Sequence, residues 1–125
     1  MRKGLLKKKR RKGENTLKFA LAIHGNEISS HFGHCEKFLI VDAQDSKEIS
    51  REALENPGHQ PGLLPRLLAQ EGVECIIAGG IGRRAQMLFS DFGIEVIAGA
   101  QGTPDAVIDA FLVGELKTGE NVCDH

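Results

Sequence analysis

The 125-residue chain contains neither tryptophan nor tyrosine, and its six phenylalanines are its only aromatic residues of the Phe, Tyr and Trp class. Proteins that hold single-stranded nucleic acid stack the bases on such side chains, so we do not expect nucleic-acid binding. Cysteine is also scarce, because Cys35, Cys75 and Cys123 are the only three and are unevenly spaced. An odd number of scattered cysteines is a poor disulfide framework and suits a reducing compartment. We therefore expect a cytoplasmic protein.

Long apolar runs are absent as well. No segment approaches the 18 or more apolar residues of a membrane span, so we expect no membrane partner. The first apolar run, "LKFALAI" at 17–23, is interrupted by Lys18 and lacks the small-residue cleavage site of a signal peptide. A chain of this length can fold as one domain without a disulfide or a structural metal. Any bound metal is therefore expected to be cargo rather than scaffold.

Charge is distributed unevenly along the chain, although the formal net charge is only -1. Eight of the sixteen basic residues lie between Arg2 and Lys12, and all seventeen acidic residues follow them. Blocks of like charge are typically solvated and disordered. We expect a disordered basic tail at 1–16, a folded domain at 17–116 and a flexible C-terminal tail at 117–125 that carries Cys and His.

Hydrophobic periodicity and turn residues predict a mixed order of elements. Strands are expected at 17–23, 37–43 and 47–54, then a helix at 63–71, a strand at 74–80, a helix at 83–92, a strand at 94–100 and a helix at 104–113. The short "QDS" link favours an antiparallel hairpin between the second and third strands. The order βββαβαβα therefore predicts an α/β fold, with a mixed sheet and helices on both faces.

A set of soft metal ligands is concentrated in the longer loops and at the C-terminus. Its members are His31, His34, Cys35, His59, Cys123 and His125. Imidazole and thiolate suit zinc, copper, iron and iron–sulfur species. A closed structural zinc site is weakly supported, because the chain has no CxxC pair and no HExxH motif. Taken singly, each residue could equally be an ordinary loop histidine or free thiol, and Cys75 is expected to be a small buried hydrophobe.

Two strand–glycine–helix junctions form a second set of candidates, "AGGIGRRA" at 78–85 and "GAQGTP" at 99–104. Helix N-termini bind anions, and glycines let a ligand approach the backbone. The candidate cofactor-binding residues are Gly79, Gly80, Gly82, Arg83, Arg84, Gly102 and Thr103. A dinucleotide site is not favoured, because that fingerprint belongs in the first βαβ unit. The glycines could instead serve only tight turns.

The blocks "HFGHCEKFLIVD", "PGLLPRLLAQEGVECIIAGGIGRRAQMLF" and "GIEVIAGAQGTPDAVIDAFLVGEL" resemble the dinitrogenase iron-molybdenum cofactor biosynthesis family over residues 17–116. This resemblance implies a ribonuclease H-like fold and an anionic cargo: the nitrogenase cofactor, its iron–sulfur precursor, or the molybdenum–copper sulfide of the orange protein. It also implies that His31 and Cys35 follow an "HFGxC" pattern and that His59 precedes "PGLLP" as in relatives. Nuclease members of the fold place acidic residues on the first strand, and "LKFALAI" has none.

The leading hypothesis is a small carrier or chaperone, not an enzyme, that binds a metal–sulfur cluster containing iron or molybdenum transiently. A cluster-assembly or recipient protein is the expected partner. The first alternative is a metal-free binding or regulatory module for a small anionic metabolite. The second is a thiol enzyme with Cys35 as nucleophile and a histidine as base.

Overall fold

A computed structural model describes residues 16–58 and 62–119 of the chain. The expected basic tail, apart from Thr16, lies outside the described residues, as do His59, Cys123 and His125.

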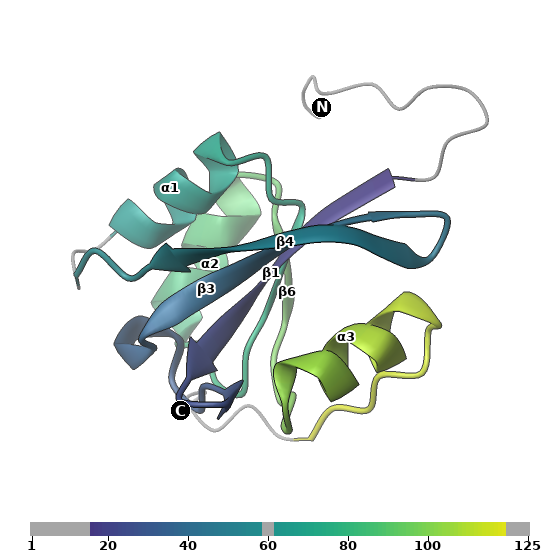
Figure 1. Ribbon diagram of the computed structural model, residues 1–125. Coiled ribbons are helices and arrows are strands. Elements are labelled where there is room, and N and C mark those ends of the chain that lie inside the picture. The colour runs from purple at the N-terminus through teal and green to yellow at the C-terminus, as the bar shows by residue number, and fades with distance from the viewer. Residues whose placement is uncertain (1–15, 59–61, 120–125) are drawn as a thin grey trace.

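The strands form one mixed sheet with the order β4-β3-β1-β5-β6. They are β1 (Thr16–His24), β2 (Glu27–Ile28), β3 (Lys37–Gln44), β4 (Lys47–Glu55), β5 (Cys75–Ile77) and β6 (Glu95–Ile97). The pairs β4–β3 and β3–β1 are antiparallel, β1–β5 and β5–β6 are parallel, and the two-residue β2 pairs only with β1. The predicted mixed sheet is therefore confirmed (Figure 1).

The hairpin between β3 and β4 is confirmed, and its turn has a clear physical cause. Asp45 and Ser46 have φ angles of 55° and 66°. Positive φ at both central residues is the mark of a type I′ turn, whose twist matches that of the flanking strands. The turn sets the pairing of Gln44 with Lys47 and of Ala43 with Glu48. An irregularity between Asp42 and Ala43 then shifts the register by one residue, so that Leu39 faces Ala53.

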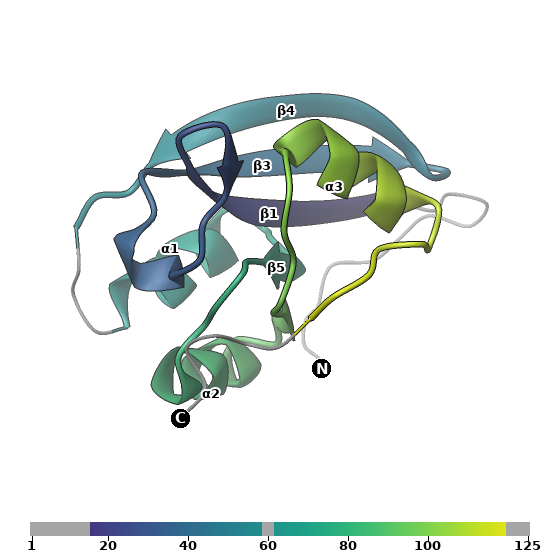
Figure 2. The same cartoon turned by 90° about the horizontal axis from the view of Figure 1, so that it is seen from below.

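Within the described residues, three helices cover the sheet, α1 (Leu63–Gln70), α2 (Arg83–Asp91) and α3 (Pro104–Leu112). Figure 1 and Figure 2 show α1 and α2 on one face and α3 on the other, as the sequence predicted. The central strand β1 is buried on both faces. It presents Ala20 and Ala22 to the α1–α2 core, and the larger Phe19, Leu21 and Ile23 to the α3 core. Small side chains on one face leave room there for the large side chains of the helices.

The sequence missed two short elements and overextended two strands. It did not predict β2 or the 3-10 turn at Phe32–His34, and β5 and β6 are shorter than the expected 74–80 and 94–100. The residues after Ile77 leave the strand ladder because their backbone groups bond to other loops, beginning with Gly79.

In residues 16–58 and 62–119, no helix has the length and apolar character needed to cross a membrane.

Candidate functional site

Three loops are joined by backbone hydrogen bonds beyond the ends of β1, β5 and β6. We call this region, residues 28–35, 78–83 and 99–103, the loop edge. The N–H of Gly79 donates to the carbonyl of Ser29 at 2.8 Å, and the N–H of Gly99 donates to the carbonyl of Gly79 at 2.9 Å. The N–H of Phe32 donates to the carbonyl of Gly80 at 2.8 Å. The carboxyl ends of parallel strands are the usual place for ligands in open α/β sheets.

Gly79 lies at the centre of this ladder, and its lack of a side chain is a packing requirement. A Cβ there would lie 2.8 Å from the carbonyl oxygen of Ser29 and 3.2 Å from that of Ala100. Because its N–H is already bonded to Ser29, Gly79 holds the loops together and does not offer that amide to a ligand.

The loop "SHFGHC" places its side chains on two sides because it forms a 3-10 turn. Such a turn repeats every three residues, so positions i and i+3 share a side. His31 and His34 are exposed, whereas Phe32 and Cys35 are 5% and 4% exposed. The two imidazole rings lie 6.4 Å apart, centroid to centroid, in an edge-on arrangement. The structure therefore brings these two predicted ligands together.

Phe32 anchors the turn that carries the histidines. Its ring lies 5.1 Å from that of Phe89 on α2 and 5.5 Å from that of Phe38 on β3, between ring centroids. At the start of the turn, the hydroxyl of Ser29 accepts from the N–H of His31 and donates to the carbonyl of the same residue. Sequence reasoning missed Phe32 as a positioning residue, although an aromatic side chain between two histidines was the available signal.

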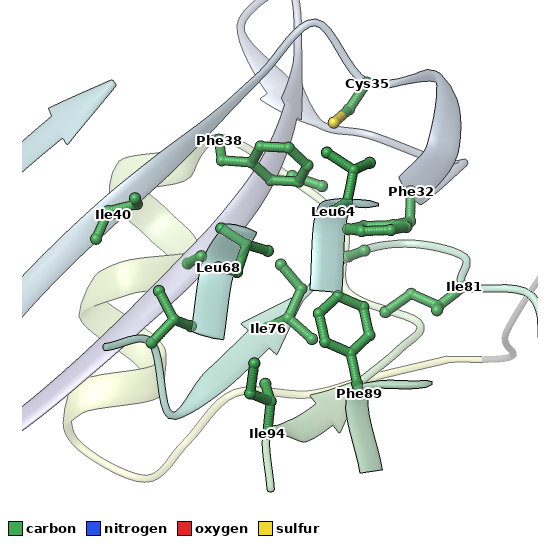
Figure 3. Close-up of a cluster of buried hydrophobic side chains, with 14 residues drawn as sticks. Phe32, Cys35, Phe38, Ile40, Leu64, Leu68, Ile76, Ile81, Phe89 and Ile94 are labelled. Atoms are coloured by element: carbon green, nitrogen blue, oxygen red, sulfur yellow. The ribbon is translucent and has the colours of Figure 1, made fainter. Parts of the chain in front are cut away.

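Cys35 points away from solvent. Figure 3 shows its sulfur directed towards Leu64 and Phe38, with which it shares the α1–α2 core. The side-chain amide of Asn56 donates to the carbonyl of Cys35 at 2.8 Å and lies 3.8 Å from the sulfur. Burial raises the pKa of the Cys35 thiol to about 11, only partly opposed by the Asn56 contact. In this conformation the thiol is protonated at neutral pH.

The junction at residues 78–85, which we call the arginine junction because it contains Arg83 and Arg84, has the features of an anion site. Gly82 precedes α2 with φ −63° and ψ 157°, and no acidic residue lies in the first turn of the helix. Arg83 and Arg84 are both exposed there. An exposed helix start with two guanidinium groups favours negative ligands.

The junction at residues 99–104, which leads into α3, is organised differently. Thr103 caps α3 as predicted, because its Oγ1 accepts from the N–H of Ala106 at 3.3 Å. The carbonyl of Gly102 accepts from the N–H of Ile28 at 2.9 Å. Both helices begin at the loop edge, but α2 and α3 cover opposite faces of the sheet, so their N-termini share only that edge (Figure 2).

The C-terminal segment also reaches the loop edge. Gly119, the last described residue, donates its N–H to the carbonyl of Gly99 at 2.8 Å. Within residues 16–58 and 62–119, no group of three or more His, Cys, Asp or Glu side chains could hold a metal ion. The described part of the chain thus supplies a pair of imidazoles rather than a closed cage.

Comparison with known proteins gives consistent matches. The family model described as dinitrogenase iron-molybdenum cofactor matches residues 15–114. The uncharacterized protein MJ0580 of Methanocaldococcus jannaschii is 37% identical over 109 residues, which cover 83% of this chain and 92% of that protein. The crystal structure of PH0822 has a TM-score of 0.79 at 31% identity and covers 84% of this chain and 96% of that one. The apo orange protein of Desulfovibrio gigas, at 23% identity, shares the fold with a TM-score of 0.68 over 83% of this chain and 93% of its own.

The role of Gly79 can be tested against a neighbouring glycine. We predict that Gly79→Ala lowers the free energy of unfolding by about 1–3 kcal/mol, because the added methyl group meets backbone atoms. Gly82→Ala is the matched control, since a Cβ at Gly82 meets nothing within 4 Å, and its change should stay within about 0.5 kcal/mol. Urea unfolding followed by circular dichroism measures both values. Equal effects of the two changes would contradict the packing role of Gly79.

The buried thiols predict a pH dependence of stability. Burial raises the pKa of Cys35 from 9.0 to about 11. Between these values the unfolded thiol loses its proton while the folded thiol keeps it, so the free energy of unfolding should fall as pH rises from 9 to 11. Cys35→Ala should make this decline shallower. Urea unfolding at several pH values measures it, and an unchanged slope in the variant would show that the thiol is not shielded from water.

Cys75 gives an internal comparison for this measurement. It is 2% exposed, as the sequence predicted, and burial raises the pKa of its thiol to about 12. Each variant should remove the part of the fall in the free energy of unfolding that its thiol causes. The part removed by Cys75→Ala should extend to higher pH than the part removed by Cys35→Ala.

Proposed function

The chain belongs to the dinitrogenase iron-molybdenum cofactor family, and from this premise we propose that it is a small carrier that binds an anionic metal–sulfur cluster at the loop edge. The observation that supports this most directly is the pair of exposed imidazoles, 6.4 Å apart, on a turn held by Phe32. Two imidazoles can bind one metal and leave its remaining positions to the sulfur atoms of the cluster. Such partial coordination suits a cargo that must also be released.

The charge of such a cargo is matched by the neighbouring loop. Metal–sulfur clusters carry negative charge, and their sulfur atoms accept hydrogen bonds. The histidine turn is bonded to the arginine junction through Phe32 and Gly80, and Arg83 and Arg84 follow within four residues. In this proposal the imidazoles coordinate metal, and the guanidinium groups donate to cluster sulfur. The cluster contains iron, molybdenum or copper in combination with sulfide.

The C-terminal ligands fit the same proposal by chain length. Cys123 is four positions after Gly119 in the sequence, so the chain allows at most about 14 Å between the two Cα atoms. Since Gly119 is bonded to Gly99, which is bonded to Gly79, the segment that leads to Cys123 and His125 starts at the loop edge. We propose these two residues, together with His59, as further ligands.

Cys35 can join the ligands only after a local rearrangement. Its sulfur would have to leave the contact with Leu64 and Phe38, and the metal would have to displace a proton from a thiol whose pKa is raised. Metal binding favours the thiolate strongly enough to drive such a proton loss. The same burial and raised pKa disfavour Cys35 as a catalytic nucleophile, and this supports a carrier rather than an enzyme. The partner of the proposed carrier would be a protein that assembles or receives the cluster.

The proposal predicts a specific dependence on the two histidines. Protein would be reconstituted without oxygen with iron and sulfide, with and without molybdate, and separately with copper and tetrathiomolybdate, then desalted and assayed for metal. The double variant His31→Ala/His34→Ala should lower the affinity for cluster about tenfold or more, because it removes both imidazoles. His24→Ala is the matched control, as His24 is exposed but lies outside the loop edge, and it should retain the cluster.

The same assay separates the remaining roles. If Cys35 joins the ligands after that rearrangement, Cys35→Ser should reduce retention sharply, and unchanged retention would remove Cys35 as a required ligand. No retention of any cluster by the wild-type protein would overturn the carrier and favour a metal-free module for a small anion. A bound cluster should be easily visible in the absorption spectrum, because a chain without Trp or Tyr absorbs little at long ultraviolet wavelengths.

The two arginines should matter for cargo and not for folding. Positive side chains at a helix start oppose the helix dipole and gain no stability from it. Arg83→Gln/Arg84→Gln should therefore weaken cluster retention while keeping the apo-protein melting temperature within a few degrees of wild type, or higher. Arg66→Gln, on the exposed side of α1, is the control and should affect neither property. A large fall in melting temperature for the double variant would show that these arginines stabilise the fold instead.

A further inference from the structure

The chain turns back sharply at Gly114, after the end of α3. The N–H of Glu115 donates to the carbonyl of Ala110 at 2.8 Å. The N–H of Gly114 donates to the carbonyl of Phe111 at 3.1 Å, and its φ is 76°. Together these features form a Schellman motif, which ends a helix and redirects the chain. Figure 1 and Figure 2 show the segment that follows, in yellow, running back alongside α3 towards the start of that helix. We call residues 115–119 the C-terminal strap.

Two contacts hold the C-terminal strap on the rest of the molecule. In its middle, the half-buried side chain of Leu116 packs against the α3 core. At its end, the N–H of Gly119 donates to the carbonyl of Gly99 at 2.8 Å. The strap therefore leads from the end of α3 to the loop edge.

The contact at the end of the strap requires a glycine at position 99. A Cβ on Gly99 would overlap the carbonyl oxygen of Gly119 and would lie 2.8 Å from its carbonyl carbon. Gly102 is a useful comparison, because its φ of 115° is also positive but the nearest atom to a Cβ there is in the side chain of Val107, at 4.0 Å. A positive φ favours glycine at both positions. Only at Gly99 does the missing side chain also leave room for the strap.

The strap can leave without disturbing the loop edge. The N–H of Gly99 donates to the carbonyl of Gly79, whereas the carbonyl of Gly99 accepts from the strap. Release of the strap therefore breaks the bond to Gly119 and exposes Leu116, but keeps the bond between Gly99 and Gly79. Short segments outside helices and strands open locally at a much lower free-energy cost than the core.

We propose that the C-terminal strap closes on the loop edge at Gly99 and slows the loss of cargo, and that it opens from the turn at Gly114 when cargo is released. Because the cargo is the cluster of the carrier proposed above, this role rests on that proposal. Cys123 and His125 follow the strap in the sequence, so a strap held at Gly99 limits how far these two proposed ligands can move from the loop edge. Gly99 is thus a positioning residue that acts through the strap.

Amide hydrogen exchange of ¹⁵N-labelled apo-protein tests the docking of the strap without any cargo. The N–H of Gly119 should exchange about fivefold faster in Gly99→Ala than in wild type, the effect of losing one hydrogen bond, and Gly102→Ala should behave as wild type. Both variants place a Cβ at a positive φ, so the comparison isolates the contact with the strap. Slow exchange of the Ile108 amide in α3 shows that a variant is folded. If Gly99→Ala fails to fold, Leu116→Ala replaces it and should also speed the exchange of Gly119.

The loss of cargo tests the role of the strap in the carrier. Protein loaded with copper and tetrathiomolybdate would be mixed with a copper(I) chelator, and the decay of the visible absorption would be followed. Gly99→Ala should lose the cluster about fivefold faster than wild type, and Gly102→Ala at the wild-type rate.

Each outcome bears on a different step. Equal exchange of Gly119 in Gly99→Ala and Gly102→Ala would overturn the docking of the strap. Faster exchange in Gly99→Ala without faster loss of the cluster would overturn its role in cargo release. Retention of no cluster by the wild-type protein would overturn the carrier and this role together, while the exchange rates of the apo-protein would still show whether the strap docks at Gly99.

Discussion

The backbone contact at Gly79 is the constraint on which the rest of the loop edge depends. The residue is bonded to Ser29 on one side and to Gly99 on the other, and no Cβ fits between the carbonyls of Ser29 and Ala100. Three segments distant in sequence are thereby held at hydrogen-bonding distance. Because a bonded ladder leaves these backbones little freedom, the side chains that project from them occupy fixed relative positions.

The histidine turn shows how local geometry divides a short motif into two roles. In a 3-10 turn, His31 and His34 share one side, while Phe32 and Cys35 share the other. Contact of Phe32 with Phe38 and Phe89 decides which side faces the core. One aromatic anchor therefore orients two imidazoles outward and one thiol inward. The outward pair is suited to an open metal site, and the inward thiol contributes to the core.

Much of the fold could be predicted from sequence because its signals are local. The link at Asp45 and Ser46 indicated a hairpin, and Thr103 and Pro104 marked the start of α3. The features that could not be predicted depend on residues distant in the sequence. The ends of β5 and β6 are set by hydrogen bonds between loops, and the burial of Cys35 depends on Asn56 and Leu64. The sequence indicated which types of residue form the candidate site. It could not indicate the direction of the Cys35 side chain, because a cysteine next to a histidine in a loop can direct its sulfur to solvent or to the core.

In the carrier that we propose, imidazole nitrogen from the loop edge coordinates a metal–sulfur cluster. Electron spin echo modulation of protein labelled with ¹⁵N-histidine and loaded with a reduced iron–sulfur cluster tests this directly. We predict modulation from histidine nitrogen that is lost in protein lacking the imidazoles of His31 and His34. A loaded cluster with no coupling to histidine nitrogen, or with coupling that persists without those two imidazoles, would contradict it.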